Sequence, residues 1–197
     1  KVIREIEAEL GVRMGDGFIL EKEGSWTEWL TEAKRTIDPY YWGRYAEFLE
    51  QEDVPEVAIV TTDRDTDNIL GRLGNPHDDK KAWDRRGLVL GHVQSGKTLN
   101  YIGLVNKAAD AGYKVIIVLA GMQDNLRKQT QGRIDEGFIG RDTGKKKGEE
   151  RVGVGNINLE KRPNYGTTKV GDFSLKVVQQ FGVQIKDLPE PLILVIK

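Results

Sequence analysis

The sequence predicts an α/β fold in which parallel strands alternate with helices, preceded by a region built mainly of helices. Two apolar, β-branched runs at 113–121 and 191–197 have the composition of strands buried within a parallel sheet. A shorter run at 87–90 is separated from the first of these by a helical pattern over 97–112. Strand, helix and strand in this order predict a right-handed βαβ unit.

The first part of the chain carries helical patterns. The segment 74–83 is polar and rich in turn residues, so we predict a boundary there between a helical region at 1–82 and an α/β region at 83–197. The last helix before the boundary is expected to end at Gly74. Helices are expected where apolar residues recur at helical spacing, at 2–10, 25–37, 39–51 and 54–74.

Three further segments complete the prediction for the α/β region. A helix is expected at 125–138, directly after the second strand. The segment 138–172, rich in Gly and Lys, predicts a loop or hairpin excursion. The segment 172–182 fits either a helix or a strand, because its residues satisfy both periodicities.

The amino-acid composition excludes several kinds of site and of protein. The chain has 197 residues, a net charge of −1 and no cysteine, so disulfides and thiolate metal sites are excluded. The balanced charge provides no general attraction to nucleic acid, and the longest apolar run, Val115 to Ala120, is far shorter than a membrane span. A cytoplasmic protein without a membrane partner is expected. Because the chain starts at Lys1 and its last apolar run stops at Lys197, we expect a piece of a longer protein.

The stretch "GHVQSGKT" carries the chemistry. It matches the P-loop, or Walker A, pattern G-x-x-x-x-G-K-[ST] between a predicted strand and a predicted helix, which is the context that the pattern requires. Glycines let successive backbone N–H groups turn toward one anion, and the helix start adds positive potential there. Lys97 would reach the β- and γ-phosphates of ATP, and the Thr98 hydroxyl would bind Mg²⁺. The predicted nucleotide-binding residues are Gly91, His92, Val93, Gln94, Ser95, Gly96, Lys97 and Thr98.

The alternative for this stretch is a glycine-rich turn without a ligand, which explains the glycines but not the Lys-Thr pair. Trp83, Arg85 and Arg86 precede the strand and could contact adenine or phosphate. A packed tryptophan beside solvated arginines explains these three residues equally well.

The segment 83–140, from "WDRRGLVLGHVQSGKT" through "YKVIIVLAGMQDNLRKQTQGRIDEGF", resembles the Z-one domain family, which is named for an endonuclease activity. The resemblance implies a RecA-like P-loop core of the kind found in superfamily two helicases. It also implies bacterial or phage proteins encoded near restriction-modification and antiviral defence genes. ATP, Mg²⁺ and nucleic acid, with DNA favoured, are the implied ligands, and restriction or defence proteins are implied partners.

The resemblance also implies a role for the helix after the second strand, where related cores touch nucleic acid or relay the nucleotide state. Amide, hydroxyl and guanidinium donors suit phosphate oxygens. A solvated helix without a ligand is the alternative. The residues in that place are Asn125, Arg127, Gln129, Thr130 and Arg133.

The chain differs from the family because it does not contain the acidic motif that binds the metal ion. The acidic, metal-binding motif that hydrolysis requires is expected beyond Lys197, so the chain corresponds to part of a first lobe and no catalytic residue is assigned. Three functions stay open: the ATP-binding part of a helicase-like hydrolase, a nucleotide-switched endonuclease that cuts elsewhere, and a non-enzymatic module that holds a nucleotide.

Overall fold

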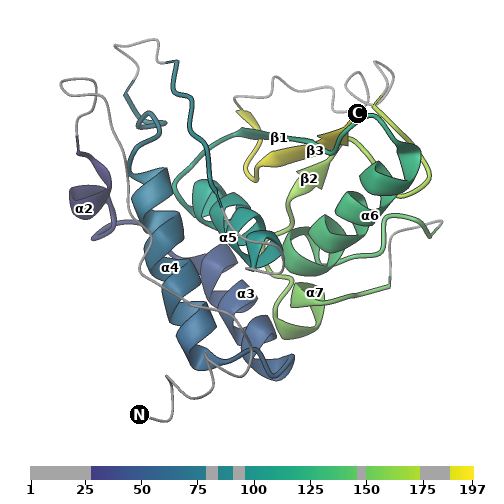
Figure 1. The fold of residues 1–197 in the computed structure, drawn as a ribbon, viewed down its shortest axis with the longest axis horizontal. Coiled ribbons are helices and arrows are strands. Elements are labelled where there is room, and N and C mark those ends of the chain that lie inside the picture. Colours follow the sequence, from purple (N-terminus) through teal and green to yellow (C-terminus); the bar gives the residue numbers. More distant parts are fainter. Residues whose placement is uncertain (1–27, 79–83, 91–95, 146–149, 174–186) are drawn as a thin grey trace.

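The computed structural model describes residues 28–78, 84–90, 96–145, 150–173 and 187–197, and it combines helices with one small parallel sheet (Figure 1). The expected mixed α/β class is therefore confirmed. The helices are α2 (Leu30–Ala33), α3 (Tyr40–Gln51), α4 (Glu56–Leu70), α5 (Lys97–Asp110), α6 (Asp124–Ile134), the π-helical turn η1 (Asp135–Ile139) and α7 (Val154–Ile157). The strands are β1 (Val115–Leu119), β2 (Asn164–Tyr165) and β3 (Leu192–Ile196).

The sheet has the strand order β1-β3-β2, and both pairs are parallel. Val115 pairs with Leu192 and Leu119 with Ile196, so β1 and β3 are matched along their whole length. Since successive side chains of a strand point to opposite faces, Ile193 and Val195 lie on one face of the sheet, and both are fully buried. That face is the one against which α5 and η1 pack.

One hydrophobic core connects the two predicted regions. Tyr45 of α3 and Ile59 of α4 belong to the same buried cluster as Ile102 of α5, Phe138 of η1 and Ile193 of β3. The predicted boundary at 82–83 is thus crossed by continuous packing. The helices α3 and α4 cover the outer side of α5, and α5 lies between them and the sheet (Figure 1).

Polar contacts strengthen the packing of α4 on α5. The side chain of Lys107 is 7% exposed, and its ammonium lies 2.6 Å from the carboxylates of both Asp63 and Asp67. The same ammonium lies 4.6 Å from the centre of the Trp42 ring. A buried cation with two anionic partners on successive helical turns fixes the register between α4 and α5.

Most predicted elements are confirmed, but within the described residues the helix expected at 25–37 is only the short α2, and the loop expected at 138–172 contains α7 and β2. Three more expectations are corrected. α4 ends at Leu70 rather than at Gly74, because the N–H groups of Arg72 and Leu73 bond the carbonyl oxygens three residues back, of Ile69 and Leu70, as in a turn. β1 is not buried on both faces, since Ile117 and Leu119 are 54% and 73% exposed. The predicted helix at 2–10 and the ambiguous segment 172–182 lie largely or wholly outside the described residues.

The third correction concerns the predicted strand at 87–90. This segment pairs with no described strand, and it runs as a plain trace outside the sheet (Figure 1). Leu88, Val89 and Leu90 are 81%, 52% and 84% exposed. An apolar composition alone does not form a strand, because the segment also needs a neighbouring strand with which its backbone can pair.

Within the described residues, no helix is long and apolar enough to span a membrane.

The start of α3 is held by a carboxylate from the end of α5. Asp110 accepts hydrogen bonds from the backbone N–H groups of Tyr41 and Trp42, each at 2.8 Å. These are two of the N–H groups that a helix cannot satisfy internally. Burial raises the pKa of Asp110 to about 7, although both hydrogen bonds oppose the rise.

This pKa predicts a specific pH dependence of stability. The ordinary pKa of aspartate is 3.8, so between about pH 4 and pH 7 the folded chain holds a proton that the unfolded chain has lost. The contribution of Asp110 to the free energy of unfolding should therefore fall as the pH rises through this window. The fall is a few kcal/mol, because one pKa unit corresponds to about 1.4 kcal/mol. Urea unfolding of the wild type and of Asp110→Asn measures it, and the stability difference between the two proteins should shrink toward pH 7. A difference that is the same at every pH would contradict this assignment.

Candidate nucleotide-binding site

The described part of the predicted cradle is the start of α5. Gly96 precedes the helix with a φ of 72°, in the left-handed region that glycine adopts without strain. Lys97 is the first helical residue and Thr98 the second, and the side chain of Lys97 reaches the surface while Thr98 is half-buried. The left-handed glycine turns the incoming chain sharply into the helix, which places both functional side chains at its amino end.

The amino end of α5 has the backbone N–H groups and the helix dipole that favour an anion. The N–H of Asn100 donates to the carbonyl oxygen of Gly96 at 3.0 Å, which is the first bond of the helix. By helix geometry, the N–H groups that precede it have no acceptor within the helix. α5 has 14 residues, and its aligned peptide dipoles add positive potential at this end. Negative charge is therefore favoured next to Lys97.

The remaining residues of the cradle, Gly91, His92, Val93, Gln94 and Ser95, lie outside the described residues, as does Trp83. Arg85 is half-buried and Arg86 is exposed. The guanidinium of Arg86 pairs with the Asp84 carboxylate, with 3.0 Å between its terminal nitrogen and the nearer oxygen. The predicted contacts of these residues with adenine or phosphate stay predictions.

The helix α6, predicted to touch nucleic acid, has two different polar faces. Asn125, Gln129 and Arg133 follow one another at intervals of four residues, and all three are exposed. Thr130, next to this face, is half-buried. These four donors lie where a nucleic-acid backbone could reach them.

Arg127 is placed differently, and its predicted contact with nucleic acid does not agree with its position. The residue is 2% exposed, and its guanidinium donates to the backbone carbonyl oxygens of Thr168 and Lys169 at 3.0 and 3.4 Å. Helical geometry explains the difference, because position 127 lies about half a turn from positions 125 and 129. Arg127 holds the 167–169 segment against α6 and presents no donor to the surface.

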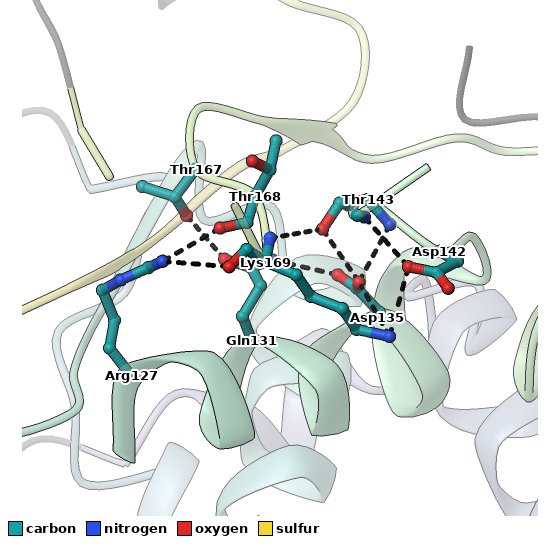
Figure 2. A network of polar contacts seen from close by, with 9 residues as sticks. Arg127, Gln131, Asp135, Asp142, Thr143, Thr167, Thr168 and Lys169 are labelled. Atoms are coloured by element: carbon teal, nitrogen blue, oxygen red, sulfur yellow. Dashed lines mark hydrogen bonds and ion pairs between the residues drawn. The ribbon is translucent and has the colours of Figure 1, made fainter. Parts of the chain in front are cut away.

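Figure 2 shows that Arg127 begins a row of buried polar side chains that runs along the inner face of α6 into the first residue of η1. Gln131 and Asp135 follow at intervals of four residues, and both are fully buried. The Asp135 carboxylate accepts from the Gln131 amide at 2.9 Å and from the backbone N–H and hydroxyl of Thr143 at 3.0 and 2.8 Å. Burial raises the pKa of Asp135, and the hydrogen bonds from Gln131 and Thr143 oppose the rise.

The row also reaches the sheet. The Thr167 hydroxyl donates to the Gln131 side-chain oxygen at 2.8 Å and accepts from the backbone N–H of Val195 in β3 at 2.8 Å. The Lys169 ammonium lies 3.8 Å from the carboxylate of Asp135 (Figure 2). The network therefore connects α6, the 142–144 loop, the 167–169 segment and β3 into one unit.

This network was not predicted from the sequence, although one signal for it exists. Arg127, Gln131 and Asp135 recur every four residues, which is the spacing of a single helix face. A second polar row, at 125, 129 and 133, lies on the opposite face. When a helix with two polar rows packs in a domain, the buried row needs its own hydrogen-bond partners, as 127, 131 and 135 have here.

Neither this network nor any other group of described residues forms a carboxylate or histidine metal site. No set of three or more such side chains is gathered in the described part of the chain. Asp135 is enclosed by its hydrogen-bond donors. Thr98, the residue that the predicted phosphate-bound Mg²⁺ would use, is the second residue of α5 and follows Lys97 directly.

No family model, no curated protein and no solved structure matches this chain. The function proposed below therefore depends on the residues of the chain itself and on the resemblance of segment 83–140.

Proposed function

We propose that this chain binds ATP and Mg²⁺ at the start of α5, as the nucleotide-binding part of a helicase-like ATPase. By the resemblance stated above, the whole protein acts on DNA within a bacterial restriction or phage-defence system. The observation that carries the proposal is the left-handed Gly96 directly before a 14-residue helix whose first two residues are Lys97 and Thr98.

Each group at the start of α5 has a role in the proposed binding of ATP. The backbone N–H groups at the start of α5 bind phosphate oxygens, and the Lys97 ammonium neutralises the charge of the terminal phosphates. The Thr98 hydroxyl is a ligand of Mg²⁺, which neutralises charge on the phosphates when it is bound. Because Lys97 reaches the surface, its side chain can meet a ligand without rearrangement of the core.

The exposed row of α6 supports the nucleic-acid part of the proposal. Tyr101, one turn into α5, lines the same groove as Thr130 and Arg133 of α6 and Ala120 after β1. Burial raises the pKa of the Tyr101 hydroxyl, and the charge of Arg133 opposes the rise, so the two side chains interact. A ligand at the start of α5 would therefore lie close to the helix that is proposed to contact DNA.

Loss of ligand-dependent stabilisation in Lys97→Ala tests the proposal. At a concentration of Mg·ATP 100 times the Kd, binding should add about 2.7 kcal/mol to the stability of the wild type, which a thermal-unfolding assay detects as a higher Tm. Lys97→Ala should lose most of this shift, because a charged partner of the phosphates is removed. Lys128→Ala removes an exposed lysine from α6 and serves as the control, whose shift should equal that of the wild type. An equal shift in all three proteins would show that the ligand binds elsewhere.

A further inference from the structure

We propose that a cavity at the amino ends of β1 and β3 binds a small zwitterion, whose ammonium group contacts Asp110 and Glu190 and whose carboxylate contacts Lys114. This inference does not require the proposed nucleotide site, because the two sites lie at opposite ends of α5. Lys97 is the first residue of this 14-residue helix and Asp110 is the last, so they are about 20 Å apart. In open α/β sheets, ligands usually bind at the carboxyl ends of the strands, so this cavity is a separate, second site.

The cavity has a volume of about 180 Å³ and lies where four segments of the chain meet. Its walls are the chain around the start of α3, the end of α5 with the turn that follows, the loop at Lys161, and residues 189–191 before β3. Sites for drug-sized ligands have volumes of roughly 300–1,000 Å³. This cavity is smaller, so it suits a ligand of the size of a free amino acid and is too small for a nucleotide.

Charged side chains of both signs line the cavity. They are Asp38, Asp110, Lys114, Lys161 and Glu190. The ammonium of Lys161 lies 2.7 Å from the carboxylate of Asp38, so these two charges neutralise each other. Among the described residues, no ion pair includes Asp110, Glu190 or Lys114. The cavity therefore has two carboxylates and one ammonium group whose charges a ligand of mixed charge could balance.

The two carboxylates are held in place by the surrounding protein. Each oxygen of Asp110 accepts one backbone N–H from the first turn of α3, and Glu190 accepts the hydroxyl of Tyr41, which is 2% exposed. Burial is the main cause that raises the pKa of Tyr41, so this hydroxyl stays protonated and remains a donor to Glu190. A carboxylate has about four acceptor positions, so both carboxylates can also accept N–H groups of a ligand ammonium.

Lys114 lies at the mouth of the cavity. This residue is exposed, whereas Asp110 and Glu190 are half-buried. Its ammonium donates to the carbonyl oxygen of Leu188 at 2.9 Å, which holds the side chain beside residues 189–191. Because an ammonium group has three donors, it can bind a carboxylate at the same time. Anions inside and a cation at the mouth fit a ligand that enters with its ammonium group first.

The protonation of Asp110 gives this binding a pH dependence. The other titratable or charged groups around it are Asp38, Tyr41, Arg44, Tyr113, Lys114, Lys161 and Glu190. Burial raises the pKa of Asp110 to about 7, and a bound ammonium group would lower it again. The proton and the ligand therefore compete for Asp110, so the affinity should increase about tenfold between pH 6 and pH 8.

Calorimetric titration with a series of ω-amino acids tests the proposal. Glycine, β-alanine, 4-aminobutyrate and 5-aminopentanoate carry the same two charges at increasing separation, so the series covers a range of distances between the two acids and Lys114. At pH 8, at least one member should bind with a Kd at least tenfold lower than the Kd of butylamine and of butyrate, which carry one of the charges each. At pH 6, the Kd of this ligand should be about tenfold higher than at pH 8.

Two variants and a control assign the binding to this cavity. Asp110→Asn should raise the Kd of the best ligand at least tenfold at pH 8 and remove the pH dependence. Lys114→Gln changes an exposed side chain, so the fold should be kept while the Kd rises. Lys128→Ala on α6 is the control and should bind as the wild type does. The proposal would be overturned if no member of the series bound more tightly than butylamine and butyrate, or if Asp110→Asn and Lys114→Gln both bound it unchanged.

Discussion

Gly155→Ala is expected to destabilise the chain by about 3 kcal/mol, the upper end of the usual cost of overpacking, because the added methyl group would meet backbone that cannot yield. A methyl group at this position would lie 1.9 Å from the carbonyl oxygen of Gly140. That oxygen cannot move away freely, because it also accepts the N–H of Val152 at 3.2 Å and belongs to a residue with a φ of 79°. α7 would have to separate from η1, and the buried Arg44 would lose an acceptor at Asn158.

Gly43→Ala is the matched control for this prediction. It lies inside α3, and a methyl group there would meet nothing within 4 Å. Alanine in an exposed helix interior is better than glycine by about 0.5–1 kcal/mol, so this variant should be slightly more stable than the wild type. Urea unfolding measures both changes. Equal effects of the two substitutions would mean that the close approach of Gly155 to Gly140 is absent in solution.

Arg127→Ala is expected to lower the free energy of unfolding by about 3 kcal/mol, which for a chain of this size corresponds to a Tm lower by about 10 °C. The guanidinium is among the largest fully buried side chains, and it donates to the carbonyl oxygens of Thr168 and Lys169. Its removal leaves a cavity in the interior and two half-buried carbonyl acceptors without their donor. The 167–169 segment should then detach from α6, and with it the Thr167 bridge to β3.

Gln129→Ala separates this structural role from a role in binding. Gln129 is exposed on the same helix, so its loss should change stability by less than about 0.5 kcal/mol. If α6 contacts DNA, this variant should instead weaken DNA binding by the protein. The assignment of Arg127 to the interior would be wrong if Arg127→Ala were as stable as Gln129→Ala.

The local pattern of the sequence was sufficient to predict α5, β1 and β3. Their signals are short-range: apolar residues at helical spacing between 97 and 110, and continuous apolar runs at 115–119 and 192–196. The start of α5 at Lys97 was also predicted, because the glycines and the Lys-Thr pair of the motif mark the point where the loop meets the helix. These features depend on neighbours in sequence, so the sequence displays them.

The features that were missed depend on partners far along the chain. Arg127 is buried because the carbonyl oxygens of Thr168 and Lys169, more than forty positions away, meet its guanidinium. A guanidinium on a helix has the same appearance in sequence whether it faces phosphate or a buried loop. Segment 87–90 has the composition of a strand, but a strand forms only where its backbone can pair with a neighbouring strand. Composition does not indicate whether such a neighbour is present.

The most direct test of the central claim, that the start of α5 binds the phosphates of a nucleotide, is a calorimetric titration of the chain with ATP and with adenosine, both in Mg²⁺. Phosphate recognition by Lys97, Thr98 and the backbone N–H groups at the start of α5 predicts a measurable Kd for ATP and binding of adenosine at least 100-fold weaker. The claim would be contradicted by adenosine that binds as tightly as ATP, or by a chain that binds neither ligand.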